Sequence, residues 1–467
     1  MRYRVDPTVR ILDDGRVVLG GSPIRLFRLS DAGARWFADV VDGRDQVVGV
    51  DPPTSRSALL RRFTDAGVVH PVPEPASDRA TVRATVVVPV RDRAEQLDRL
   101  LRTLRSASSG HVGVEVAEVI VVDDGSIDAA AHAAVAARHG ARLLRREESG
   151  GPAAARHDGI VAAGHEVVAV VDSDVEVCPG WLDPLVAHLV DDHVAAVAAR
   201  VCSAPGVGVF AAHDQHRSPL DLGPTPARVA PGTRVSYVPA AAMVIRRGAY
   251  DAVGGFDRAL RFGEDVDLEW RLVAAGWSVR HEPLVPVRHA PRADLRSWLR
   301  QRFDYGTSAA PLAARHPTAL APVRCSPWSL AVWILVILGH PVAALVVAGG
   351  TAAALARRLD GVPSLSAAEL AVRGHLGAGR LLARAVVRVW WPVALLAALV
   401  SRRVRHVLLG ATVVAAADHW WNDGDPLALR LVPIALLDDL AYGAGVWAGC
   451  LRAGAPRALL PEFRHDT

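Results

Sequence analysis

One apolar run constrains the fold of this chain more than any other stretch. Residues 167–171 read Val-Val-Ala-Val-Val, and carboxylates follow at Asp172 and Asp174. Such an unbroken valine-rich run is typical of a strand buried on both faces of a parallel sheet. Ligands of open α/β sheets bind beyond the carboxyl ends of the strands, and two hard oxygen donors there suit a divalent cation. An acidic turn after an ordinary strand is the alternative, so the surrounding sequence must decide.

The flanking sequence predicts the rest of this sheet. Between residues 80 and 320, apolar runs alternate with segments of helical spacing, which indicates an α/β domain with a mostly parallel sheet. Strands are expected at residues 84–90 and 116–122. The second run leads into Asp123 and Asp124, and two carboxylates before a glycine fit the base and ribose of a nucleotide. An ordinary acidic turn with a helix N-cap is the alternative.

Two later segments supply further polar groups. Residues 148–156 run from a glutamate through Gly-Gly-Pro to Arg156, whose guanidinium could reach a diphosphate. A helix predicted to start near Glu264 would place Glu264 and Asp265 at the positive end of the helix dipole, where Asp265 fits a general base. A short apolar run precedes His289, whose imidazole fits a metal ligand. A helix-start charge preference and a structural histidine are the alternatives.

Composition excludes several kinds of chemistry. The chain contains no lysine, which excludes a lysine nucleophile, a Schiff base and a P-loop lysine. Its four cysteines lie far apart without a Cys-x-x-Cys motif, so neither a disulfide framework nor a zinc site is indicated. Arginines and aspartates occur throughout the first fifteen residues, so we expect no signal peptide and a cytosolic soluble part.

Residues 1–76 look like a small separate module. Helices are expected over residues 31–41, capped by Ser30, and over residues 55–66. Two short helices followed by a two-stranded wing predict a winged-helix-like fold. Since no helix carries a dense basic stripe, we expect the module to bind a peptide or a partner protein and not nucleic acid.

Residues 326–455 are apolar and predict a helical, membrane-associated region. Residues 326–356 contain no Asp, Glu or Arg, and this run is longer than the ~20 residues that cross the hydrocarbon. His340-Pro341 and Gly349-Gly350 interrupt it. We expect one or two spans with further helices in the interface, and the α/β domain on the cytoplasmic side of the cell membrane, because arginines follow the apolar runs. The buried helical core of a soluble protein is the alternative.

In their order along the chain, six short segments resemble family 2 glycosyltransferases of the GT-A fold. They are residues 86–89, 122–126, 151–156, 172–174, 255–257 and 263–268. Each segment is weak alone, but all six in sequence are specific, and they cover about residues 84–310. The resemblance implies a GT-A nucleotide-sugar-binding domain and a hexosyltransferase that uses Mg²⁺ or Mn²⁺.

The resemblance also assigns roles to the site residues. It implies that a UDP-sugar donor is bound by Pro89, Asp123, Asp124, Arg156 and Asp172, and that a metal ion is held by Asp174 and His289. Asp265 matches the catalytic base, and one displacement with this base would invert the anomeric carbon, so an α-linked donor would give a β-glycoside. His157 stands where the family has an asparagine, which leaves one polar contact open.

One further segment bears on the acceptor. Residues 301–305 lie where processive members such as cellulose synthases carry Gln-x-x-Arg-Trp, but Asp304 replaces the arginine, which leaves processive synthesis unsupported. The possible acceptor or diphosphate contacts are Glu264, Gln301, Arg302 and Tyr305. Packing of this helix onto the domain is the alternative.

The plan of the whole chain narrows the resemblance. A short N-terminal module, a family 2 domain and an apolar C-terminal region resemble the glycosyltransferases of mycofactocin systems in actinobacteria, with residues 27–33 and 59–70 as a less specific part. This resemblance implies transfer of glucose from UDP-glucose to a peptide-derived redox cofactor precursor, which builds β-linked glucose units. Sugar transfer to a lipid or polyprenyl phosphate and a non-catalytic scaffold that binds a nucleotide-sugar or a peptide are the alternatives.

Overall fold

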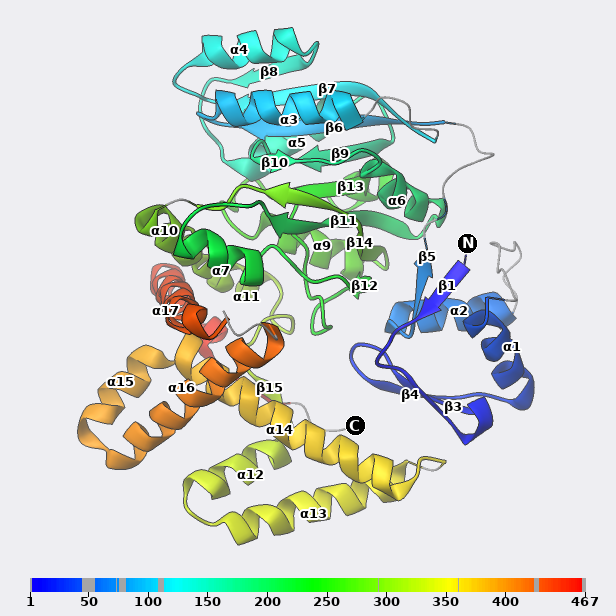
Figure 1. Ribbon diagram of the computed structural model, residues 1–467, viewed down its shortest axis with the longest axis vertical. Helices are drawn as coiled ribbons and strands as arrows, with labels where there is room; N and C mark the ends of the chain where they lie inside the picture. Colours follow the sequence, from blue (N-terminus) through cyan, green and yellow to red (C-terminus); the bar gives the residue numbers. More distant parts are fainter. Residues whose placement is uncertain are drawn as a thin grey trace. The chain divides into compact units, whose positions relative to one another are not determined.

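The computed structural model forms two compact units (Figure 1). It describes residues 2–43, 55–72, 74, 81–107, 113–292, 294–359, 361–423 and 428–463. The unit that we call the sheet unit comprises Met1–Gly206 and Arg217–Pro291, and the helical unit comprises Val207–His216 and Arg292–Thr467. The boundary predicted between residues 76 and 80 lies outside the described residues.

A nine-stranded mixed sheet forms the centre of the sheet unit. Neighbouring strands follow the order β10-β14-β11-β13-β9-β6-β7-β8, and β12 pairs with β14. The strands β9, β6, β7 and β8 run parallel, whereas β13 is antiparallel to both of its neighbours. The strands are β6 (Val82–Val90), β7 (Val114–Asp124), β8 (Arg142–Arg146), β9 (Val167–Val171), β10 (Val175–Glu176), β11 (Val194–Ser203), β12 (Ala227–Val229), β13 (Ala242–Arg246) and β14 (Ser278–His289).

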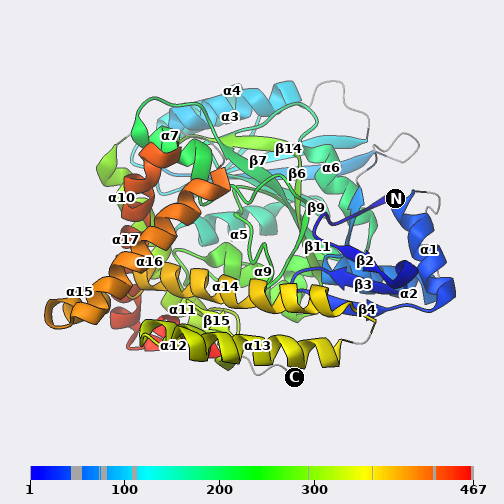
Figure 2. The same cartoon turned by 60° about the horizontal axis from the view of Figure 1, so that its bottom comes forward.

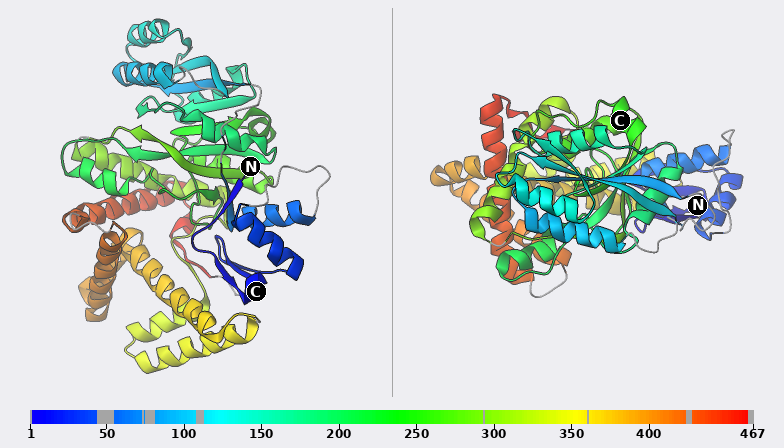
Figure 3. Two further views of the ribbon diagram at one scale, coloured as in Figure 1. Left: turned by 45° about the vertical axis from the view of Figure 1, so that its right-hand side comes forward. Right: turned by 90° about the horizontal axis from the view of Figure 1, so that it is seen from above.

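Both faces of this sheet are buried, as the valine-rich runs predict. Successive side chains of a strand point to opposite faces, and in β9 Ala169 and Val171 join one hydrophobic cluster while Val168 and Val170 join the other. Helices α3 (Ala94–Ala107), α4 (Ala129–Arg138) and α6 (Leu182–Ala187) contribute to the first cluster. Helices α5 (Pro152–Ala162), α8 (Arg247–Ala252) and α9 (Glu264–Ala274) contribute to the second, so helices cover the sheet on both sides (Figure 3).

The N-terminal part of the sheet unit has its own small core. Helices α1 (Asp31–Val41) and α2 (Ser55–Ala66) have the predicted bounds, and Gly33 N donates to Ser30 Oγ at 3.2 Å. Strand β1 (Arg2–Val5) pairs with β5 (Val69–Val72), while β2 (Arg10–Leu12), β3 (Val17–Gly20) and β4 (Arg25–Arg28) form a separate antiparallel sheet. The winged-helix arrangement is not confirmed, because this sheet precedes both helices and the strand after them pairs with β1.

The helical unit contains long apolar helices. Its elements are most of α7 (Val209–Arg217), then α10 (Leu295–Thr307), α11 (Ala309–Arg315), β15 (Arg324–Cys325), α12 (Pro327–Ile337), α13 (Pro341–Arg358), α14 (Ser364–Arg388), α15 (Trp391–Val400), α16 (Arg402–Asp423), α17 (Ala428–Ala453) and β16 (Glu462–Phe463). The predicted break at His340-Pro341 separates α12 from α13, but α13 continues through Gly349-Gly350. Figure 2 shows the hairpin of α12 and α13 beside α14.

Among the described residues, one helix is long and apolar enough to cross a membrane, at Leu429–Ala453 of α17. Helices α14 and α15 pass the same test only as a pair bent by 85°. These lengths and compositions alone leave open whether α17 crosses a membrane or lies in the core of the helical unit.

Candidate active site

The carboxylates that follow β9 lie at the carboxyl edge of the sheet, as predicted. Asp172 N donates to Ala241 O at 3.0 Å, which fixes this residue beside the start of β13. Val175 pairs with His289 across β10 and β14, and this register brings His289 Nε2 to 3.2 Å from Asp174 Oδ1. The structure therefore joins two residues that are far apart in the sequence and that were both assigned to the metal.

A cationic side chain shares the carboxylate of Asp174. Arg93, three residues beyond the end of β6, pairs with Asp174 Oδ2 through its NH1 atom. Among the residues that the structure describes, no group of three or more His, Cys, Asp or Glu side chains is placed to hold a metal ion. A carboxylate oxygen and an imidazole nitrogen nevertheless fit Mg²⁺ or Mn²⁺ as two of several ligands, and the ion pair with Arg93 marks this carboxylate as a place that attracts positive charge.

Arg156 is the hub of a second cluster at the same edge. Its NH2 atom lies 2.6 Å from Asp172 Oδ1, and its NH1 atom pairs with Glu264 Oε1. The guanidinium lies 5.9 Å from the centroid of the Phe256 ring. Burial lowers the pKa of Arg156, but the two carboxylates outweigh this effect and hold the pKa above its ordinary value. The cluster therefore gathers residues from α5, the β9 edge and α9.

Asp265 lies in the first turn of α9. Gly263 precedes this helix with a φ of +76°, a conformation that glycine adopts without strain. Asp265 Oδ2 accepts a hydrogen bond from Ala240 N at 3.3 Å, and Oδ1 accepts one from Val266 N at 2.8 Å. Burial raises the pKa of Asp265, while Arg156 opposes the increase. Asp265 as a residue is partly buried, and both oxygens of its carboxylate accept backbone hydrogen bonds.

Glu264, the neighbour of Asp265, is enclosed. Burial and the adjacent Asp265 raise the pKa of Glu264, and Arg156 lowers it. Glu264 pairs with Arg156 and so helps to position this guanidinium. The acceptor or diphosphate contact suggested by the sequence stays a prediction.

The pair Asp123 and Asp124 makes hydrogen bonds within the protein. Both residues end β7, and Asp123 is buried, accepts from Ser126 N at 3.0 Å and pairs with Arg145. Asp124 accepts from Gly150 N at 2.9 Å and from Gly151 N at 2.8 Å, so it shapes the glycine turn before α5. Binding of the base and ribose by these two carboxylates therefore stays a prediction.

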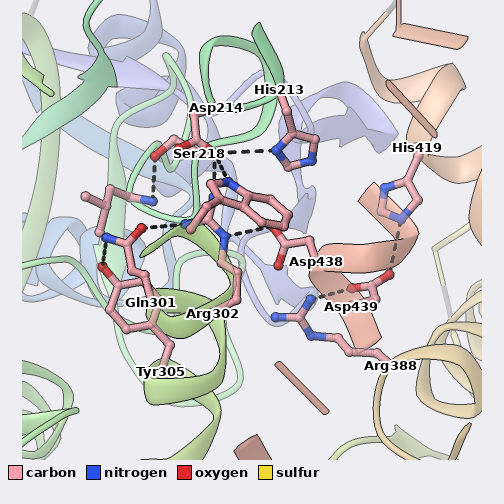
Figure 4. A network of polar contacts seen from close by, with 12 residues as sticks. His213, Asp214, Ser218, Gln301, Arg302, Tyr305, Arg388, His419, Asp438 and Asp439 are labelled. Carbon is pink, nitrogen blue, oxygen red and sulfur yellow. Dashed lines mark hydrogen bonds and ion pairs between the residues drawn. The ribbon is translucent and has the colours of Figure 1, made fainter. Parts of the chain in front are cut away.

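Pro89 and the α10 residues complete the predicted set. Pro89 is buried in β6, where it faces Val122 of β7. Gln301 and Tyr305 lie on α10 of the helical unit, and Gln301 Nε2 donates to the Tyr305 hydroxyl at 3.0 Å. Arg302 is 2% exposed, with its guanidinium between Asp214 and Asp438 in Figure 4. An acceptor contact by Arg302 would require these ion pairs to break, so packing of α10 accounts for this residue.

Sequence reasoning missed Glu269, which lies one turn after Asp265 on α9. Glu269 is fully buried, and its Oε2 atom accepts from Val238 N at 3.0 Å. Its Oε1 atom has no hydrogen-bond partner among the described residues. Burial and the nearby Asp265 raise the pKa of Glu269 well above its ordinary value, so the neutral acid is favoured. Glu269 and Asp265 together hold the backbone of residues 238–240, and their spacing of four residues is the signal that could have found the pair.

We expect Glu269→Gln to retain stability and turnover, because a neutral amide oxygen can still accept from Val238 N. Glu269→Ala should lower the free energy of unfolding by about 1–3 kcal/mol, since a buried N–H loses its partner, and should reduce turnover because the segment that contacts Asp265 loosens. Denaturant unfolding and steady-state kinetics measure both effects. Equal damage by both substitutions would instead show that the charge of Glu269 matters.

Comparison with known proteins identifies the family of this chain. Residues 85–254 match the family model described as glycosyl transferase family 2. A relative from Mycobacterium tuberculosis, a pre-mycofactocin glycosyltransferase, is 41% identical, and the alignment covers 99% of this chain and 97% of the relative. Polypeptide N-acetylgalactosaminyltransferase 15 of Mus musculus is 29% identical over 52% of this chain and 41% of its own length. The solved mannosyltransferase PcManGT from Pyrobaculum calidifontis is 16% identical, covers 81% of this chain and 90% of that chain, and gives a TM-score of 0.45.

The mixed sheet and the matched segment define a family 2 glycosyltransferase with a GT-A-like fold. The identity of 41% extends over nearly the whole of both chains, including the N-terminal module and the helical unit. The chain belongs to the family of pre-mycofactocin glycosyltransferases.

Proposed function

We propose that this enzyme transfers glucose from UDP-glucose to a peptide-derived redox cofactor precursor, with inversion at the anomeric carbon. The observation that carries this proposal is the carboxylate of Asp265 at the start of α9, near Arg156 and Asp172, at the sheet edge that also bears Asp174. The near full-length identity to a pre-mycofactocin glycosyltransferase supports the class of acceptor.

In the proposed reaction, Asp265 removes the proton of an acceptor hydroxyl. The hydroxyl oxygen forms a bond to the anomeric carbon as the bond from that carbon to the diphosphate breaks, so UDP leaves and the configuration inverts. The hydrogen bond from Ala240 N holds the carboxylate of Asp265 in place. Arg156 forms ion pairs with both Glu264 and Asp172, and these pairs hold the start of α9 against the end of β9.

Asp174 and His289 are the proposed protein ligands of Mg²⁺ or Mn²⁺. When bound, such an ion neutralises the charge that grows on the leaving diphosphate. Their facing oxygen and nitrogen atoms, 3.2 Å apart, support this assignment. Arg93 on the same carboxylate would contribute further positive charge at this end of the site.

Removal of divalent cations with a chelator should abolish transfer, and Mg²⁺ or Mn²⁺ should restore it. Asp174→Asn should lower kcat by at least about 10²-fold, because several kcal/mol of charge stabilisation are lost, and should raise the metal concentration that gives half-maximal activity. Asp251→Asn, an exposed aspartate on α8, makes the same charge change and should behave like the wild type. Full activity of Asp174→Asn in chelator would contradict the metal assignment.

The pH dependence of transfer should have an acid limb set by Asp265. Only the ionised carboxylate can accept a proton, and burial raises the pKa of Asp265 above its ordinary value of 3.8. The value of kcat/KM should therefore fall as the pH decreases, with a midpoint above 3.8. A profile that stays flat down to that pH would remove Asp265 from the role of base.

We further propose that the N-terminal module binds a peptide or a partner protein, and that the enzyme works at the cytoplasmic side of the cell membrane. The separate hydrophobic core of the module supports an independent role. The exposed apolar helices of the helical unit support membrane contact.

The decisive experiment offers the purified enzyme UDP-glucose together with one of two acceptors. Mass spectrometry should detect a hexose on the peptide-derived precursor and none on a polyprenyl phosphate. A hexose only on the lipid phosphate would favour the alternative acceptor, which the apolar helices of the helical unit motivate. If the protein binds UDP-glucose but neither acceptor gains a hexose, the result would favour a non-catalytic scaffold.

A further inference from the structure

The helix that could cross a membrane by composition packs against other helices of the helical unit. Asp438 and Asp439 stand near the middle of α17. Arg302 of α10 pairs with Asp438 Oδ2 at 3.0 Å, and Arg388 of α14 pairs with Asp439, as Figure 4 shows. His419 Nε2 of α16 lies 3.2 Å from the other oxygen of Asp439. Three neighbouring helices thus satisfy the acidic side chains of α17.

The backbone of α17 also packs closely on its neighbours. A Cβ atom at Gly445 would lie 2.0 Å from Phe303 O, and one at Gly443 would lie 1.8 Å from Arg388 O. Because only glycine fits these contacts, α17 is held against both α10 and α14. A lipid-exposed span would lose these contacts and would leave two carboxylates unpaired in hydrocarbon, which is costly.

Exposed apolar side chains are numerous on α12, α13 and α15. Val342 and Leu345 of α13 are 73% and 72% exposed, and Leu399 and Val400 of α15 are 76% and 89% exposed. Helix α15 has no buried residue. Trp328 of α12 is also exposed, and tryptophan favours the interface between lipid and water. Apolar surface on this scale marks a site of interaction.

The charges around these helices identify the partner. Residues 326–359 and 389–417 contain no Asp or Glu. Exposed arginines form the end of α13 and follow α15, namely Arg357, Arg358, Arg402, Arg403 and Arg405. Apolar helices with a basic rim and no acidic residue complement the surface of a membrane that carries anionic phospholipids.

The lengths of α12 and α15 argue against crossing. At about 1.5 Å per residue, the 11 residues of α12 and the 10 residues of α15 reach about half of the ~30 Å hydrocarbon. The chain after α17 also returns to its starting side, because β16 pairs with β15, and Arg324 Nε lies 2.6 Å from Glu462 Oε2.

We infer that α12, α13 and α15 form a monotopic surface that binds an anionic phospholipid bilayer, with their apolar side chains at the boundary of headgroups and acyl chains. The arginines contact the headgroup phosphates, and α17 stays within the protein. This inference deepens the membrane association proposed above and does not depend on which acceptor receives the sugar.

Flotation of the full-length protein with vesicles tests the inference. Vesicles of phosphatidylcholine with phosphatidylglycerol should bind the wild type at least about tenfold better than phosphatidylcholine alone, and high salt should reduce this advantage. A double substitution, Leu396→Glu with Leu399→Glu, and a charge reversal, Arg402→Glu with Arg403→Glu, should each reduce binding at least about tenfold. Ile127→Glu, at a position 93% exposed in the sheet unit, should have no effect.

Two further readouts separate the competing explanations. A C-terminal tag on protein bound to sealed vesicles should stay fully accessible to added protease, and protection of the tag would overturn the inference in favour of a span. Sedimentation without vesicles tests whether the surface pairs with a second copy. Dissociation of an oligomer by the leucine substitutions, with vesicle binding unchanged, would also overturn it. Glucose transfer to a soluble acceptor is the folding control, and both variants should retain it. If the wild type itself transfers no glucose, that result contradicts the proposed function and not the membrane inference.

Discussion

Asp265→Asn should lower the rate of sugar transfer by about 10³-fold or more, which is the upper part of the range for loss of a general base. The asparagine amide has nearly the same shape but cannot accept the proton of the acceptor hydroxyl. The asparagine side chain has one acceptor oxygen, whereas the two carboxylate oxygens accept hydrogen bonds from Ala240 N and Val266 N. Binding of UDP-glucose should persist, so calorimetry with the donor and the rate of transfer together isolate the chemical step.

The same substitution should change the stability only slightly, because one backbone donor loses its acceptor while the cost of a buried charge is removed. Because folding raises the pKa of Asp265, its ionisation opposes folding, and this cost is present once the pH exceeds the folded-state pKa. Asparagine removes the charge. Asp251→Asn serves as the control, with unchanged transfer and unchanged melting. If Asp265→Asn kept more than about a tenth of the wild-type rate, another residue would have to be the base.

Arg156→Ala should lower the free energy of unfolding by about 3–5 kcal/mol, because it removes one partner from a buried ionic cluster. Asp172 and Glu264 would then lack their common cation, and Glu264 is enclosed. Transfer should be lost as well, since the start of α9 carries Asp265. Denaturant unfolding followed by circular dichroism measures the change in stability.

Two controls make this result specific. Arg258→Ala removes a half-exposed arginine from its 2.5 Å contact with Asp158 and should cost less than about 1 kcal/mol. Adding Glu264→Gln to Arg156→Ala should recover part of the stability, because one unpaired buried charge disappears. A loss of similar size for Arg156→Ala and Arg258→Ala, without recovery by Glu264→Gln, would mean that the cluster is not a stabilising unit.

Local patterns predicted the elements that depend on short-range chemistry. Ser30 caps α1 and the bounds of both N-terminal helices agree with the prediction, because capping and apolar spacing act within a few residues. The winged-helix arrangement of the same module is not confirmed, since β1 pairs with β5 and this pairing joins residues about seventy positions apart. The similarity of short sequence segments to a known fold does not determine which strands pair with each other.

The gathering of the site was predictable in part for a topological reason. Asp172 and Asp174 follow a central strand, and parallel strands end at one edge, so polar residues after such strands meet there. The roles of individual carboxylates were not predictable in the same way. Asp124 binds the turn of Gly150 and Gly151, and Arg302 is enclosed by Asp214 and Asp438, because these partners come from other elements.

The sequence by itself determined the α/β sheet, the edge at which its carboxylates lie and the family of the enzyme, because periodic burial and ordered motifs are written along the chain. Only the tertiary structure decided that Arg93 shares the carboxylate of Asp174 and that Glu269 braces the segment beside Asp265. It also decided that α17 lies among its neighbours with its aspartates paired. Composition records how apolar a helix is, whereas the partners of its few charges depend on which distant helices pack against it.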